Sequence, residues 1–346
     1  SNKLLIMNDT VLGHPKGLVT LFATEMWERL SFYGMRALLV LFMTDQVING
    51  GMSLTDADAT AIYGIYTALV YLVALPGGWV ADRIIGAQSA ILAGGIIIMC
   101  GHFVLAIPSI NTFFLGLLLV ILGTGLLKPN ISAILGALYM RGDHRRDAGF
   151  SIFYMGINLG GMLGPIICGA LAQNENFGWH YGFAVAGIGM LFGVIQFWKT
   201  RKYLGQAGRK KSNFNMREKQ FLFLVCMLIV LGLFWFSRLN IENINFIKIS
   251  EITTYIILFA AFGFFAYVLL LGKLNIQERS RVWVIIALFL GASMFWAGFE
   301  QAGSSLNLFA NRYTKLEFGW LTLYSSWFQS VNSIFIIIFA PMFAYL

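Results

Sequence analysis

The most constraining feature of this sequence is its repetition of long apolar stretches. A helix needs about 20 apolar residues to cross the hydrocarbon core of a bilayer, and stretches close to that length recur along the chain. Charged residues make up only 12% of the chain, against about 25% in an ordinary soluble domain. The sequence therefore predicts an all-α polytopic membrane protein with ten spans, at roughly 18–43, 58–80, 87–107, 112–138, 148–172, 181–198, 220–237, 252–272, 282–310 and 318–346.

The distribution of Lys and Arg in the loops predicts the orientation. The loops placed on one side carry 14 Lys and Arg residues, and those on the other side carry none. The first set is 1–17, 81–87, 140–147 and 199–219, and the second is 44–57, 108–111 and 173–180. Because cytoplasmic loops are enriched in these residues, we expect a cytoplasmic N-terminus. The asymmetry also accounts for the net charge of +8, so no nucleic-acid partner is expected.

The basic stretch 199–219 divides the chain. Six spans precede it within residues 1–198, and we interpret the stretch as a cytoplasmic linker that contacts anionic membrane lipid. The two spans within 220–281 carry few polar residues, so we expect them to form a peripheral hairpin that faces lipid. The last two spans lie within 282–346.

Six ionisable residues fall inside the predicted spans, where a charge is costly. The cost is on the order of 3 kcal/mol at the centre of a helix unless the side chain faces protein or water. In the first span the four charged residues share one face with Phe32 and Tyr33, within an arc of roughly 140°. Such residues are functional candidates by default; they are Glu25, Glu28, Arg29, Arg36, Lys128 and Glu300.

Glu25, Glu28 and Arg29 form a group suited to binding a proton. One guanidinium cannot neutralise two carboxylates, so one carboxylate can take up a proton at modest cost. The alternative is a static ion-pair network that fixes helix packing.

Lys128 and Glu300 are isolated charges in other spans. Lys128 precedes Pro129, which interrupts the helical hydrogen bonding, so we expect its amine to face a cavity or an acid. The alternative, snorkelling to the interface, is disfavoured because many residues separate it from the loop. Glu300 is expected to titrate or to pair with a cation elsewhere. Asn158 and Asn332 are weaker candidates, because a buried Asn also serves helix–helix packing.

Signatures of catalysis are missing from the sequence. The His and Cys residues have no metal-ligand spacing, and we find no nucleotide-binding loop, zinc-protease motif or nucleophile elbow. We therefore expect no enzymatic activity, no metal and no cofactor. A transporter remains the best class, since a receptor-like protein does not explain the buried charges.

Four motifs, in order, resemble those of the proton-dependent oligopeptide transporters. Residues 25–34 (EMWERLSFYG) resemble the family's ExxERFxYYG motif, with Leu30 and Phe32 as departures. Residues 150–161 (FSIFYMGINLGG) are similar to its second signature, and Lys128-Pro129-Asn130 and Glu300-Gln301 also resemble family positions.

The resemblance implies the major facilitator fold, in which two six-helix bundles surround a central cavity. Bacterial members insert two helices between the bundles, which agrees with the division of the chain given above. The region 282–346 would then hold the first two helices of the C-terminal bundle, so we expect the chain to be part of a longer protein.

The implied function is proton-coupled symport of di- and tripeptides across the bacterial inner membrane by alternating access, with a monomer as the transport unit. The alternative is proton-coupled transport of another small solute, such as nitrate, a drug or a peptide-like compound, on the same fold.

The resemblance also implies roles for individual residues. Proton coupling would involve Glu25, Glu28, Arg29, Lys128 and Glu300. Substrate binding would involve Arg29, Tyr33, Arg36, Tyr71, Lys128, Asn158, Trp296 and Asn332. Within this set, the cations would hold the carboxylate of the peptide. Tyr33, Tyr71 and Asn158 would hydrogen-bond the peptide backbone. Asn332 would bind near the amino end of the peptide, and Trp296 would line a pocket for one of its side chains.

Overall fold

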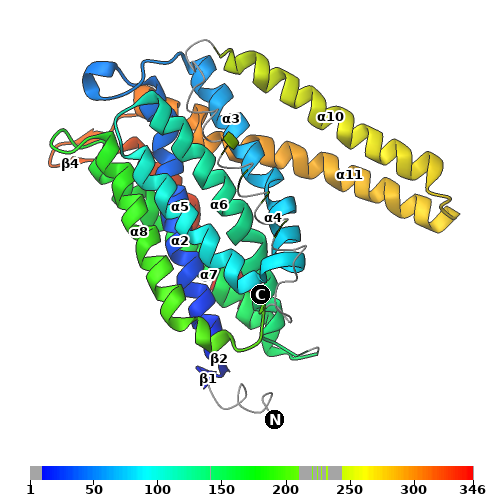
Figure 1. Ribbon diagram of the computed structural model, residues 1–346. Helices are drawn as coiled ribbons and strands as arrows, with labels where there is room; N and C mark the ends of the chain where they lie inside the picture. Colours follow the sequence, from blue (N-terminus) through cyan, green and yellow to red (C-terminus); the bar gives the residue numbers. More distant parts are fainter. Residues whose placement is uncertain are drawn as a thin grey trace.

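The computed structural model describes residues 10–140, 142–209 and 244–345, with the isolated positions 220, 224, 227, 231 and 232. Nearly all of these residues are helical (Figure 1). Two short antiparallel hairpins complete the described part: β1 (Thr10–Val11) with β2 (His14–Pro15), and β3 (Glu317–Phe318) with β4 (Leu321–Thr322).

The first six predicted spans form a helical bundle, with boundaries within a few residues of those expected. A helical turn, η1 (Val47–Asn49), follows the first helix, and η3 (Arg201–Leu204) follows the last. The second span is divided into two helices and a π-helical turn. The elements are α2 (Lys16–Thr44), α3 (Asp56–Leu72), α4 (Ala74–Val80), η2 (Ala81–Ile85), α5 (Ala87–Leu105), α6 (Ile110–Ala137), α7 (Arg145–Ala172) and α8 (Trp179–Thr200).

Close helix packing in the bundle depends on small residues. Gly94 of α5 lies against Gly123 of α6, and a Cβ added at Gly123 would come within 2.6 Å of the Gly94 carbonyl oxygen. Small residues at such crossings let two backbones approach each other in a membrane. The glycines of the apolar runs therefore serve packing here.

α2 is the most buried of the long helices and the most charged. In the described part of the chain, seven helical segments are long and apolar enough to cross a membrane. α2 is long enough, at 29 residues, but it is not one of these seven segments. Lys16 and the four internal charged residues of α2 are distributed so that no part of the helix of membrane-spanning length is largely free of charge. Its charged segment lies between two apolar clusters, one around Leu18 and Leu21 and one around Leu38 to Met43.

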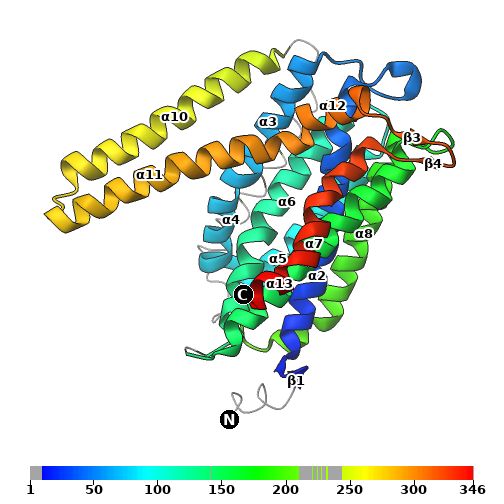
Figure 2. The same ribbon diagram turned by 180° about the vertical axis from the view of Figure 1, so that it is seen from behind.

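Beyond the bundle, two long helices project away from it. α10 (Phe246–Leu271) leaves the bundle beside α3, and α11 (Ile276–Phe299) returns toward it (Figures 1 and 2). None of the residues of either helix is buried. α10 corresponds to the second helix of the predicted hairpin. The predicted first helix, 220–237, and most of the linker after residue 209 lie outside the described residues, apart from isolated positions.

The last two spans differ from the prediction. The expected helix 282–310 begins earlier, at Ile276, and is interrupted by the tight turn η5 (Glu300–Gly303) before α12 (Ser305–Tyr313). The expected helix 318–346 is wrong over its first part, because β3, β4 and η6 (Ser325–Gln329) precede α13 (Ser330–Tyr345). Gly319, with φ of +65°, supplies the left-handed residue that this hairpin turn needs. The apolar residues of 318–324 therefore form a loop and not a span.

Candidate functional site

A cavity of about 730 Å³ lies between the six-helix bundle and the later helices. Its wall is built from α2, α3, α6 and α7 on one side and from α11, η5, η6 and α13 on the other. Ten of the eleven residues singled out from the sequence line it, and Glu28 contacts the lining residue Arg29. The ten are Glu25, Arg29, Tyr33, Arg36, Tyr71, Lys128, Asn158, Trp296, Glu300 and Asn332.

The charged face of α2 forms a buried ion-pair network. The Nε atom of Arg29 lies 3.1 Å from Oε1 of Glu25, and its Nη2 atom donates to Oε1 of Glu28 at 2.7 Å. A further bond joins the Arg29 Nε to the other oxygen of Glu28. All three side chains are buried, and the second oxygen of Glu25 has no hydrogen-bond partner among the described residues. One guanidinium is thus shared by two carboxylates, as the spacing predicted.

Lys128 reaches the cavity from α6, at the position just before Pro129. Its Nζ atom lies 4.4 Å from the centre of the Tyr71 ring of α3, a cation–π contact with the ring face. No carboxylate of the described residues lies within ion-pair distance of this amine. The amine therefore lies in the cavity wall without a direct ion-pair partner among the described residues, and it is a suitable contact for an anionic group.

Arg36 and Glu300 connect the two sides of the cavity. Arg36 Nη1 of α2 lies 3.4 Å from Oε2 of Glu300 in η5, and both side chains are largely buried. The Nε atom of Arg36 has no hydrogen-bond partner among the described residues. The geometry pairs Glu300 with a cation from another helix, one of the two outcomes expected from the sequence.

The remaining predicted residues supply polar and aromatic surface. The Tyr33 ring lies near both arginines of α2, with 5.6 Å to the Arg29 guanidinium and 5.4 Å to that of Arg36. The amide nitrogen of Asn158 donates to the Tyr154 carbonyl of its own helix at 2.9 Å. Trp296 is half-exposed, and Asn332 is exposed on α13.

Some lining residues were not singled out from the sequence. They are Tyr154, Ile157, Gly161, Phe299, Ala302, Phe328, Gln329, Ser333 and Ile336. Tyr63, which contacts Glu300 behind the wall, was also missed. A phenol in an apolar span is the only signal that could have marked Tyr63 or Tyr154, and it is a weak one.

Polar contacts join the two sides beyond the cavity, at the end of the bundle away from the N-terminus, here called the distal end. Arg312 of α12 binds both carboxylate oxygens of Asp56 at the start of α3, at 2.6 and 2.8 Å. Gln173, after α7, accepts from the Ser326 hydroxyl at 2.7 Å, and its amide donates to the Ser325 hydroxyl at 3.0 Å. These contacts join the distal ends of α3 and α7 to α12 and η6 on the other side.

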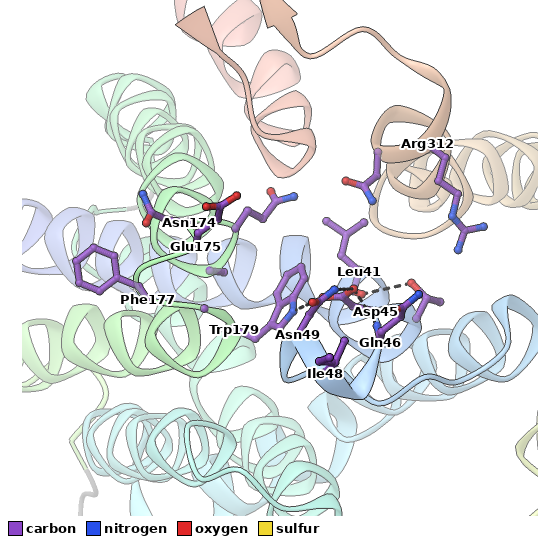
Figure 3. Close-up of a pocket in the computed structure, with 15 residues that line it drawn as sticks. Leu41, Asp45, Gln46, Ile48, Asn49, Asn174, Glu175, Phe177, Trp179 and Arg312 are labelled. Carbon is purple, nitrogen blue, oxygen red and sulfur yellow. Dashed lines mark hydrogen bonds between the residues drawn. The ribbon is translucent and has the colours of Figure 1, made fainter.

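A second cavity, of about 850 Å³, opens at the distal end (Figure 3). Its lining is mostly polar and includes Asp45. The Asp45 carboxylate accepts from the Trp179 indole at 2.8 Å and from the Asn49 amide at 3.0 Å. Because these donors already occupy the carboxylate, the arrangement serves mainly to hold the loop after α2 against the start of α8.

Comparison with known proteins gives a family for this architecture. Residues 88–346 match the profile described as the POT family. The chain is 42% identical over 336 residues to the uncharacterized transporter YclF of Bacillus subtilis (strain 168), covering 96% of this chain and 68% of that protein. It is 40% identical over 349 residues to a di-/tripeptide transporter of Lactococcus lactis subsp. cremoris, covering 96% and 69%.

A solved structure shares the fold. A crystal structure of a peptide transporter POT in complex with sulfate superposes with a TM-score of 0.87 at 41% sequence identity. The alignment covers 99% of this chain and 71% of that one. The predicted all-α membrane fold is confirmed by this likeness.

Proposed function

This chain belongs to the POT family, and from that premise we propose that it is a proton-coupled symporter that imports di- and tripeptides by alternating access. The observation that carries the proposal is the pairing of Arg36 with Glu300 across a cavity that is also lined by Lys128, which forms no ion pair with a described residue. One wall thus offers the amine of Lys128 to the cavity, and the link between the two walls contains an acid, Glu300, that a proton can neutralise.

A zwitterionic peptide fits this distribution of charge. Lys128 and the guanidinium of Arg36, both of which line the cavity, would attract its carboxylate. Tyr33, Tyr71 and Asn158 would hydrogen-bond its backbone. Because these contacts are made to the peptide backbone and not to the peptide's side chains, the site would accept peptides of many sequences. Asn332 would bind near the amino end, and Trp296 would contact a side chain.

The two acid groups would couple the proton to movement. Protonation of Glu300 removes the charge that holds Arg36 and frees that cation for the peptide. Protonation of Glu25 or Glu28 would relieve the excess of carboxylates around Arg29. Protonation of Glu300 weakens the ion pair between the two walls, which could then rock about the bound peptide. Protonation of Glu25 or Glu28 changes the charge around Arg29 within α2.

The structure is consistent with a state closed at the distal end, which the loop charges would place outside the cell. In this proposal the N-terminus is cytoplasmic, residues 1–198 form one bundle, 220–281 a peripheral hairpin, and 282–346 part of a second bundle. The linker 199–219 would contact anionic lipid. The protein would act as a monomer in the bacterial inner membrane.

The test is uptake of labelled dialanine into liposomes that contain the whole protein. An inward proton gradient is imposed, and a parallel sample receives an uncoupler. We expect accumulation above equilibrium that the uncoupler abolishes. A folded protein that accumulates no dialanine or other short peptide would contradict the substrate class. Accumulation that survives the uncoupler would contradict proton coupling.

A further inference from the structure

The mechanism above uses Arg36 and Glu300 but not the tyrosine that touches the pair. Tyr63 of α3 is buried. Its hydroxyl lies 3.4 Å from the Glu300 carboxylate atom Oε2 and 3.4 Å from the Glu300 backbone carbonyl. The phenol therefore donates toward both the side chain and the backbone of the residue that pairs with Arg36.

Gly303, at the end of the same helical turn, makes room for this phenol. A Cβ added at Gly303 would lie 2.2 Å from the Tyr63 hydroxyl oxygen, 2.7 Å from its Cζ atom and 3.0 Å from Arg36 Nε. Atoms cannot approach this closely, so any side chain at position 303 would push the turn away from α3. The contact between Tyr63 and this turn thus exists only because the residue is glycine.

We propose that Tyr63 is a positioning residue of the gate: seated against Gly303, it holds the Glu300 carboxylate on Arg36 and so favours closure of the distal end. This inference rests on the proposed transport function, because a gate matters only if the two walls separate. Tyr63 belongs to the first bundle, whereas Gly303 and Glu300 belong to the segment that faces it. When the distal end opens, their contact must break.

The test measures the distance across the distal end in the whole protein. Spin labels are attached to cysteines introduced at Ile48 and Trp320, which are 88% and 92% exposed, after Cys100, Cys168 and Cys226 have been replaced. Distance distributions are recorded by pulsed electron resonance in nanodiscs. The variants are Gly303→Ala, Tyr63→Phe, Tyr63→Leu and the double variant Tyr63→Leu with Gly303→Ala.

Gly298→Ala is the matched control, because a Cβ at Gly298 in α11 would meet no atom within 4 Å. We expect Gly303→Ala to lower the ratio of closed to open states by at least about tenfold, and Gly298→Ala to leave it unchanged. Tyr63→Phe removes the hydroxyl that makes two long contacts with Glu300, and it should lower the ratio by about threefold. In the Tyr63→Leu background, Gly303→Ala should change the ratio by less than about twofold, because the conflict with the phenol is gone and only the 3.0 Å approach to Arg36 Nε remains.

Two results would overturn the inference. One is a Gly303→Ala distribution equal to that of the Gly298→Ala control. The other is a Gly303→Ala shift of the same size with and without Tyr63. If Gly303→Ala fails to fold, Tyr63→Phe decides alone, and an unchanged ratio rejects the inference. Dialanine uptake by the parent protein is measured separately, so absent uptake with the expected distance shifts would reject the proposed function and leave the Tyr63 contact standing.

Discussion

The Arg36 guanidinium lies 3.4 Å from the Glu300 carboxylate and joins the first helix of the bundle to the turn that separates α11 from α12. The pair lies in the cavity wall, and Glu300 begins the turn that leads into α12, the helix whose Arg312 binds Asp56. One interaction thus belongs both to the site and to the contact between the two walls. The predictions below follow from this double position.

Glu300→Gln should uncouple peptide from protons. The amide cannot ionise, so Arg36 stays free and no proton is needed to release it. We expect loss of proton-driven accumulation, while exchange of labelled for unlabelled dialanine across the same liposomes continues. The two assays are run side by side on one preparation. Glu251→Gln, on the exposed surface of α10, is the control and should retain both activities. Full accumulation by Glu300→Gln would contradict the role given to this acid.

Lys128→Gln should weaken peptide binding. A charge-assisted hydrogen bond to a carboxylate contributes about 1.5–3 kcal/mol, which corresponds to a rise in KM of about 10- to 100-fold. We expect the rise in KM to be larger for dialanine than for a peptide amide, because the amide lacks the carboxylate that Lys128 would bind. Lys248→Gln, at the exposed start of α10, serves as the matched control. An equal loss for peptide and peptide amide would mean that Lys128 does not bind the carboxylate.

Glu28→Gln should abolish accumulation driven by protons but allow some counterflow. The Gln side chain keeps the size of the acid, so the buried space around Arg29 remains filled while one titratable group is lost. Glu25→Gln should have the same direction of effect. The measurement is dialanine accumulation at an imposed proton gradient, followed by counterflow without one. A Glu28→Gln protein that still concentrates dialanine would instead favour a static packing role for the network.

The Asp56–Arg312 ion pair should contribute little to the free energy of unfolding. Its main effect should be to favour the state in which the distal end is closed. Both side chains are largely exposed, and exposed ion pairs contribute about 0–1 kcal/mol. We expect Asp56→Asn to leave the thermal midpoint nearly unchanged and to increase labelling of a cysteine placed in the distal cavity at Asn174. Exchanging the charges, Asp56→Arg with Arg312→Asp, should restore slow labelling. If the exchanged pair labels as fast as Asp56→Asn, the ion pair does not close this end.

The sequence was enough to predict those features that depend on local composition. Apolar length placed the helices of the first bundle, and the cost of charge in a membrane marked residues such as Glu25 and Lys128 that the fold brings to one cavity. The helix break at Glu300 and the hairpin at Gly319 were not predicted, because apolar composition alone does not distinguish a loop from a membrane-spanning helix. Tyr63 was missed for another reason: its partner Glu300 is distant in the sequence, and only the fold brings them together.

The position of the charged segment of α2 between two apolar clusters also bears on how the protein is made. This helix is synthesised before the helices that cover it, yet each of its internal charges would cost on the order of 3 kcal/mol in lipid. The neighbours that cover it, α7 and α8, are synthesised more than a hundred residues later. We therefore expect α2 to enter the lipid bilayer only together with these helices, and a chain truncated before α7 to leave α2 outside the bilayer.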